Sequence, residues 1–243
     1  MFSDVALPKP PSFNEADVSD KPRAVRSMPM LDREGVKKAE GLYRDRLRSL
    51  QSVDEMVARL FATLDGTGQL GHTYVFFASD NGSHMGEHRI RGGKRFPYEE
   101  SAKMPLFVRG PGITPGSSID ELVLNTDYAE TWAEMAGATF DGDGRSLVPL
   151  LKGDSPSWRS SILLEGFYTK EPPPPYSAIR TKTQKYVEYS GAETELYDLP
   201  IDPYELENVS DTADSALVAD LKRKLDALRS CAGQACHDAE DTL

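Results

Sequence analysis

Two residues with oxygen-donor side chains, Asp80 and Asn81, follow directly after an apolar run. The run, residues 74–78, is aromatic and β-branched without alternation, which predicts a strand buried on both faces in a parallel sheet. Ligands bind at the carboxyl ends of the strands in such sheets. A carboxylate and an amide oxygen suit Ca²⁺ or Mg²⁺, so the pair is a candidate metal site. A hydrogen-bonded Asn-Gly turn is the alternative explanation.

A cluster of basic side chains follows these candidate ligands. Its members, which surround the pair Gly92-Gly93, are Arg89, Arg91, Lys94 and Arg95. No acidic residue lies between Arg89 and Arg95, although the formal net charge of the chain is -11. Local cations in an acidic chain indicate an anion at that place. A solvated basic loop is the alternative.

A long amphipathic helix is predicted ahead of this segment. Apolar residues recur at helical spacing over residues 36–64, and the pattern ends at Gly66 or Gly68. One long helix or two abutting helices fit this pattern. We expect the apolar stripe to be a core face packed on the sheet.

Shorter elements follow the basic cluster. Residues 105–108 form a second apolar run typical of a buried strand, and residues 122–124 predict another short strand. Residues 128–136 predict an amphipathic helix that Gly137 stops. Together with the long helix, these elements indicate an α/β core.

The composition changes beyond Lys152. Short strand candidates lie at residues 160–167, 176–181 and 185–189. A helix over about residues 214–230 carries leucines on one face. The chain is therefore predicted to have an extended surface segment at 1–31, the α/β core at 32–155, and a small antiparallel sheet covered by a helix at 156–243.

The composition also excludes some functions. Nucleic acids and anionic membranes require a basic surface, which a chain of net charge -11 does not offer in general. No apolar run approaches the ~20 residues that span a bilayer. The first residues lack the basic start and apolar stretch of a signal peptide, so no export address is visible.

The two cysteines, Cys231 and Cys236, lie near the end of the chain. Their spacing allows a small loop-closing disulfide after a helix, which would indicate an oxidising compartment. A reduced pair in a frayed tail is the alternative.

The order of several short motifs resembles the second half of the type I sulfatases, a family within the alkaline-phosphatase-like superfamily. The motifs are SDNG at 79–82, GEH at 86–88, K-x-x-x-Y-E at 94–99 and PLFVRGPG at 105–112. Within that family the chain is most similar to the N-acetylglucosamine-6-sulfatases. Three further stretches carry this likeness, namely PSFNEAD at 11–17, SVDEMVARL at 52–60 and LRSCAGQAC at 228–236.

The resemblance implies hydrolysis of a sulfate ester on a sulfated sugar. In the family, a formylglycine made from a Cys or Ser in a C/S-x-P-x-R motif acts beside a bound Ca²⁺. The resemblance assigns Asp80 and Asn81 as metal ligands and Lys94 as the catalytic cation on the sulfate oxygens. It adds Arg91 and His88 as further substrate contacts. Removal of one such contact is expected to cost on the order of 3 kcal/mol in the transition state.

The resemblance also implies a fold and a compartment. The fold is the C-terminal part of the main mixed or parallel α/β sheet with flanking helices, followed by a small antiparallel sheet under a helix. Residues 195–199 resemble the closing strand of that smaller sheet. The matching tail favours a disulfide between Cys231 and Cys236. The family is secreted, periplasmic or lysosomal.

The expected site is incomplete in this sequence. No C/S-x-P-x-R motif occurs in it. Asp80 and Asn81 offer fewer than the roughly six to eight oxygens that Ca²⁺ takes. We therefore expect a C-terminal portion of a sulfatase, inactive alone, whose partner is the missing N-terminal half of the same fold. A non-catalytic remnant or interaction module is one alternative, and a phosphodiesterase or phosphonate hydrolase of the same superfamily is another.

Overall fold

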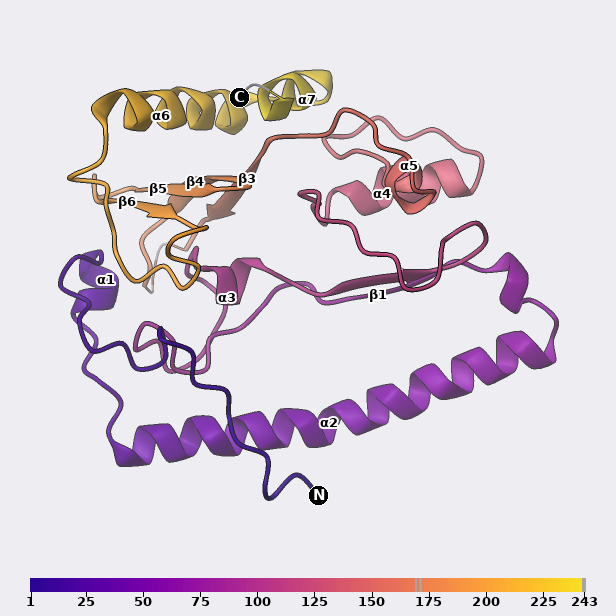
Figure 1. Ribbon diagram of the computed structural model, residues 1–243, viewed down its shortest axis with the longest axis horizontal. Helices are drawn as coiled ribbons and strands as arrows, with labels where there is room; N and C mark the ends of the chain where they lie inside the picture. Colours follow the sequence, from indigo (N-terminus) through magenta and orange to yellow (C-terminus); the bar gives the residue numbers. More distant parts are fainter. Residues whose placement is uncertain (169, 171, 242–243) are drawn as a thin grey trace. The chain divides into compact units, whose positions relative to one another are not determined.

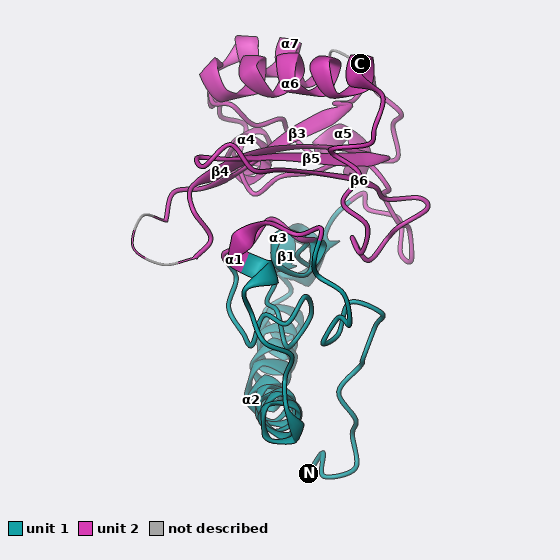
Figure 2. Ribbon diagram, turned by 90° about the vertical axis from the view of Figure 1, so that its left-hand side faces the viewer, with its two compact units in different colours: residues 1–19, 25–94, 99–111 teal, residues 20–24, 95–98, 112–243 magenta. Residues whose placement is uncertain are grey.

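The structure is a computed structural model that describes residues 1–168, 170 and 172–241. It contains two compact units, drawn in two colours in Figure 2. Unit 1 comprises Met1–Ser19, Val25–Lys94 and Glu99–Pro111, and unit 2 comprises Asp20–Ala24, Arg95–Tyr98 and Gly112–Leu243. The three-part organisation predicted from the sequence, with boundaries after residues 31 and 155, is a different division and stays a prediction.

The long helix of unit 1, α2, runs without a break over Arg33–Gly66 (Figure 1). Asp32 caps its start, because the Asp32 carboxylate accepts a 2.8 Å hydrogen bond from the backbone N–H of Gly35. Ala39 is buried and packs with Leu7 and Met85. Of the two alternatives that the sequence left open, the structure has the single helix.

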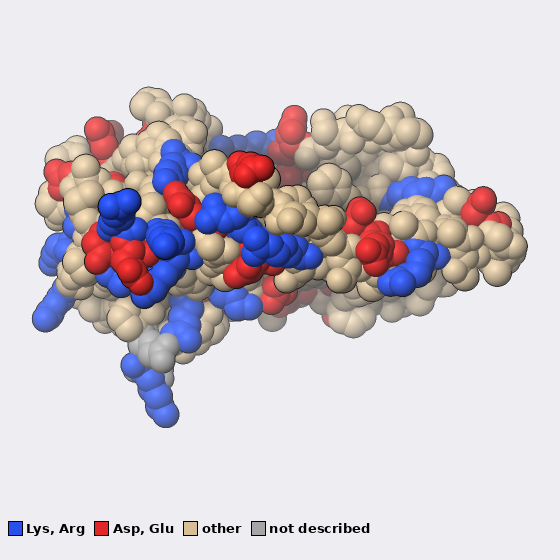
Figure 3. All heavy atoms as spheres, turned by 90° about the horizontal axis from the view of Figure 1, so that it is seen from below, with Lys and Arg blue, Asp and Glu red and all other residues tan. Residues whose placement is uncertain are grey.

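The apolar stripe of α2 is only in part the core face that the sequence predicted: Ala39 is buried, most of the stripe is half-buried, and Leu50 and Leu60 are exposed. Leu50 and Leu60 are 49% and 44% exposed. Figure 3 views the side on which α2 lies in Figure 1, and Lys and Arg side chains are interspersed there with Asp and Glu side chains. Helical spacing identifies an apolar stripe, but it does not say which surface covers that stripe.

The strand that precedes the candidate metal ligands, β1 (Val75–Ala78), pairs antiparallel with β2 (Leu106–Arg109). Phe77 faces Phe107 in this register, and the two are 41% and 67% exposed. The predicted parallel strand buried on both faces is therefore wrong for these residues. β2 is the one strand paired with β1 in the described part of the chain, and the residues of β1 are half-buried or exposed.

Unit 2 contains the antiparallel sheet and covering helix that the sequence predicted. The strands, in the order β3-β4-β5-β6, are β3 (Ser161–Gly166), β4 (Tyr176–Thr181), β5 (Gln184–Tyr189) and β6 (Thr194–Asp198). The helix α6 (Ser215–Ser230) lies along one face of this sheet (Figure 1). Its buried Leu221, Leu225 and Leu228 pack against Ile179, Tyr186 and Leu196 of the strands.

Short elements complete the fold. They are α1 (Arg23–Arg26), the 3-10 turn η1 (Leu70–His72), α3 (Glu99–Ala102), α4 (Asp127–Met135), α5 (Val148–Leu151) and α7 (Gln234–Asp241). The strand predicted at residues 122–124 is wrong, because the Leu124 N–H donates to the Asp127 carboxylate and not to a neighbouring strand. Among the described residues, no helix combines the length and the apolar character that a membrane span requires.

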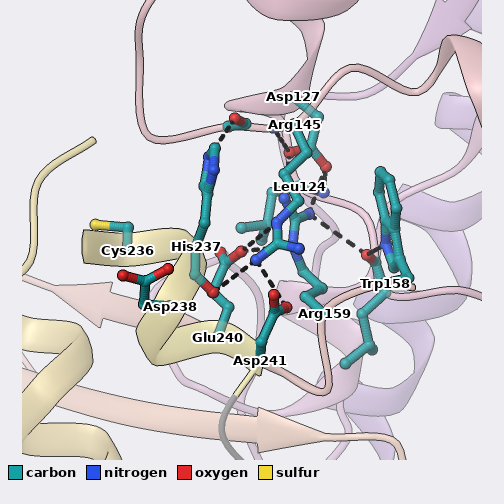
Figure 4. Close-up of polar contacts among 12 residues, drawn as sticks. Leu124, Asp127, Arg145, Trp158, Arg159, Cys236, His237, Asp238, Glu240 and Asp241 are labelled. Carbon is teal, nitrogen blue, oxygen red and sulfur yellow. Dashed lines mark hydrogen bonds and ion pairs between the residues drawn. The ribbon is translucent and has the colours of Figure 1, made fainter. Parts of the chain in front are cut away.

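A buried ionic cluster joins α4 to α7 (Figure 4). The Arg159 guanidinium forms two 2.6 Å bonds to the Asp127 carboxylate and a 2.8 Å bond from Nε to Glu240. Neither the Arg159 nor the Asp127 side chain has exposed surface. Nearby, a disulfide joins Cys231 to Cys236, the pairing that the resemblance favoured.

Candidate anion and metal site

The turn that leaves β1 is fixed by hydrogen bonds and by close packing. The Asn81 side-chain amide donates to the Gly82 carbonyl at 2.7 Å, and the Gly82 N–H donates to the Ser101 carbonyl at 2.9 Å. A Cβ atom on Gly82 would collide with the backbone carbonyl of Glu100. A glycine is therefore needed here for close approach of two backbones.

The loop after this turn brings Lys94 to Asp80. The His84 N–H donates to the Gly93 carbonyl at 2.9 Å, which closes the base of the loop. Lys94 Nζ then lies 3.1 Å from Asp80 Oδ2. Both side chains are at the surface, with 52% of Lys94 and 77% of Asp80 exposed. Two of the residues that the sequence singled out thus meet at the end of β1.

The charge of this pair suits an anion-binding role. The hydrogen bond from Lys94 lowers the pKa of the Asp80 carboxyl, so Asp80 is ionised at neutral pH. A lysine ammonium has three donors, and the exposure of Lys94 makes it accessible to a ligand. Arg91 is exposed in the same loop. Lys94 and Arg91 are therefore both able to contact an anion from solvent.

His88 is placed differently from these cations. Its ring has no exposed surface, and its Nδ1 lies 2.7 Å from Glu15 Oε2. Its Nε2 is 3.7 Å from Glu100 Oε2, which is ion-pair distance and longer than a hydrogen bond. A direct substrate contact by His88 stays a prediction, and its geometry supports a role in bracing the loop.

The carboxylates around His88 keep it charged. Burial opposes the charge, but the contacts with Glu100 and Glu15 outweigh it and raise the pKa of His88 to about 9. Burial likewise disfavours an ionised Glu100, yet the contact with His88 lowers the pKa of Glu100 to about 2. The two shifts describe one interaction, a buried ion pair under the loop.

Arg89 attaches the same loop to the start of the chain. Its guanidinium donates to the backbone carbonyls of Glu15 at 2.8 Å, Ala16 at 2.7 Å and Met28 at 3.2 Å. His88 and Arg89 both have positive φ, 51° and 61°, which bends the loop here. The sequence analysis identified Arg89 as one member of the basic cluster and did not predict its bonds to these carbonyls. The bracing role of Glu15 was missed, and the PSFNEAD stretch that contains it was the available signal.

The metal ligands assigned by the resemblance fit a hard cation in kind but not in number. Asp80 and Asn81 bring a carboxylate and an amide oxygen to one turn, which are ligands that Ca²⁺ accepts. In the described part of the chain, no group of three or more His, Cys, Asp or Glu side chains is arranged to hold a metal ion. These two residues could supply part of a Ca²⁺ shell and would need further oxygens to complete it.

The fold and this site define a class, and comparison with known proteins agrees with it: the chain belongs to the sulfatase family. The family profile described as Sulfatase matches residues 8–138, and the profile described as N-sulphoglucosamine sulphohydrolase, C-terminal, matches residues 86–231. A curated relative, the N-acetylglucosamine-6-sulfatase of Bos taurus, is 31% identical over 97% of this chain and 48% of its own length. The chain spans about half the length of the curated relatives it matches.

Solved structures show the same architecture, that of sulfatases with the alkaline-phosphatase-like fold. A protein crystallised with its substrate D-glucosamine-2-N,6-O-disulfate is 28% identical, with a TM-score of 0.76 over 85% of this chain and 43% of that one. The phosphonate monoester hydrolase of Agrobacterium radiobacter is 30% identical, with a TM-score of 0.67 over 74% of this chain and 40% of that one.

Proposed function

We propose that the chain is the C-terminal part of a sulfuric ester hydrolase that acts on sulfated sugars. The observation that carries this proposal is the Lys94–Asp80 pair at the end of β1, exposed and separated by 3.1 Å. An ammonium held by a carboxylate beside an amide oxygen suits a site where a cation and a sulfate group meet.

Each residue of the proposed site has a defined task. The ammonium of Lys94 contacts the non-bridging sulfate oxygens and neutralises the negative charge that grows as the ester bond breaks. Asp80 orients Lys94 through their hydrogen bond. Asp80 and Asn81 would hold Ca²⁺, which when bound supplies further positive charge to the sulfate oxygens. Arg91 is a further substrate contact. His88 braces the loop from its buried position against Glu15.

The nucleophile is proposed to come from a polypeptide segment outside these 243 residues. This sequence has no C/S-x-P-x-R motif in which a formylglycine could form. The proposed partner is the N-terminal half of the same fold. The exposed Phe77 and Phe107 of the β1–β2 ladder support this, because such apolar surface is typical of interfaces. The chain alone is expected to be inactive.

The names of the relatives support a sulfated amino sugar as substrate. One is an N-acetylglucosamine-6-sulfatase, and another was crystallised with a glucosamine disulfate. We propose a sulfate ester on a glucosamine-type sugar on this basis.

A second candidate keeps the site but changes the leaving group. The likeness to a phosphonate monoester hydrolase favours hydrolysis of phosphonate monoesters or phosphate diesters, within the same superfamily. A non-catalytic remnant that retains only the fold is the third candidate, and the absent motif is its support.

One assay distinguishes the three candidate functions, because each predicts a different outcome. The chain is combined with a polypeptide that carries the C/S-x-P-x-R half, and N-acetylglucosamine-6-sulfate and phenyl phosphonate monoesters are offered in parallel. Release of inorganic sulfate at the higher kcat/KM supports the sulfatase. Faster cleavage of the phosphonate supports the second candidate, and no turnover of either compound by the stable complex supports the remnant.

A further inference from the structure

The four residues after Lys94 belong to a different unit from Lys94 itself. Lys94 ends one segment of unit 1 and Glu99 begins the next, whereas Arg95–Tyr98 belongs to unit 2. Phe96 and Tyr98 in this segment are buried, at 6% and 0% exposure. The proposed catalytic lysine therefore stands immediately before a segment that is fixed by the contacts of unit 2.

A buried carboxylate of β6 holds the end of that segment. Glu195 has no exposed surface and accepts a 2.7 Å hydrogen bond from the hydroxyl of Tyr98. The hydroxyls of Tyr197 and Tyr189 donate to the same carboxylate at 2.6 and 2.7 Å. Burial raises the pKa of Tyr98 well above its ordinary value, so its hydroxyl keeps the proton that it donates.

A buried lysine of β5 holds the neighbouring residue. Lys185 Nζ donates to the carbonyl of Pro97 at 3.0 Å and forms a 2.7 Å ion pair with Glu205. The Lys185 side chain is fully buried. The backbone at Pro97 and the side chain at Tyr98 are thus both bound by buried polar groups of the C-terminal sheet.

Stability alone does not account for this choice of residues. Buried charged groups are often replaceable by packed apolar residues of similar size without loss of stability, and their best-attested effect is to fix one arrangement. Directional bonds to two consecutive residues fix both the position and the course of the chain there.

We propose that Glu195 and Lys185 are positioning residues for Lys94, because they anchor the segment Arg95–Tyr98 and so fix the point from which the Lys94 side chain extends. The inference rests on the proposed function for the role of Lys94. The position of Lys94 matters because a displacement of about 1 Å at a group that stabilises a transition state can reduce the rate about 100-fold.

Two variants that remove equivalent hydroxyls test the anchor. Tyr98→Phe and Tyr189→Phe each delete one 2.7 Å hydrogen bond to Glu195, but only Tyr98 lies in the anchored segment. The readout is amide hydrogen exchange of His84, whose N–H is bonded to the carbonyl of Gly93, the residue before Lys94. We expect this amide to exchange at least about tenfold faster in Tyr98→Phe. We expect a change below about twofold in Tyr189→Phe.

The amides of β3–β6 show whether the sheet itself is altered. Equal acceleration at His84 in both variants, or loss of protection across β3–β6 in both, would mean that the hydroxyls only support the sheet and would overturn the proposal. In the assembled hydrolase, Tyr98→Phe is expected to lower kcat more than Tyr189→Phe does. If the assembly hydrolyses nothing, the proposed function fails while the exchange result still decides the anchor.

Discussion

At the residue scale, the loop after β1 carries both exposed cations and a buried ion pair. Lys94 and Arg91 are exposed, whereas His88 is buried and lies within ion-pair distance of Glu15 and Glu100. The sequence identified Lys94, Asp80 and Asn81 through motif order. The burial of His88 could not be predicted in this way, because it depends on Glu15, which is remote in sequence.

The His88 ion pair gives the chain a pH-dependent stability. The folded pKa of about 9 lies above the ordinary value of 6.5, so the contribution is complete below about pH 6.5 and is lost as pH rises through 9. The shift corresponds to on the order of 3 kcal/mol. We expect the free energy of unfolding to fall by that order between pH 6.5 and 9, measured by urea denaturation.

The variant His88→Gln isolates this effect. It should lower stability at pH 6.5 and flatten the decline between pH 6.5 and 9, while His72→Gln, which alters an exposed histidine, should leave the decline intact. An equally steep decline in His88→Gln would show that another group causes the pH dependence.

Arg159 is predicted to be far more sensitive to substitution than an exposed arginine of unit 2. Its replacement by Met leaves the buried carboxylates of Asp127 and Glu240 without this partner, which should destabilise the chain by about 3–5 kcal/mol. The control is Arg223→Met, which breaks an exposed pair with Asp220 and should cost below about 1 kcal/mol. Similar midpoint shifts for the two variants in urea titrations would contradict the assignment.

At the element scale, the sequence was most informative where the apolar side chains of an element are covered within the same unit. The strands of unit 2 and α6 were predicted within a residue or two, because their apolar positions are buried within the same unit. The apolar runs of β1 and α2 were correctly located, yet their burial was not, because it depends on neighbouring segments. The Glu195 and Lys185 anchor was missed because its members are distant in sequence.

Replacement of one leucine in each helix tests the difference in burial between α6 and α2. Leu225 of α6 is fully buried, so Leu225→Ala should destabilise the chain by about 2–5 kcal/mol. Leu50 of α2 is 49% exposed, so Leu50→Ala should change stability by only about 0.5 kcal/mol. Urea denaturation followed by circular dichroism gives both values, and a larger loss for Leu50→Ala would contradict the exposure described for α2.

At the scale of the whole molecule, the chain consists of two compact units, and the proposed site lies in unit 1. The chain spans about half the length of its curated relatives, and its described residues supply two hard oxygen donors and one well-placed ammonium. The central claim is that these groups act on the sulfate of a sugar when the remainder of the sulfatase fold is present.

Sulfate release by the assembled enzyme with and without the Lys94 ammonium tests this claim most directly. With N-acetylglucosamine-6-sulfate as substrate, Lys94→Ala should lower kcat/KM about 100- to 1,000-fold, because it removes a charge that stabilises the transition state. Lys152→Ala, which removes an exposed lysine of unit 2, should leave kcat/KM unchanged. Retention of full activity by Lys94→Ala would contradict the account.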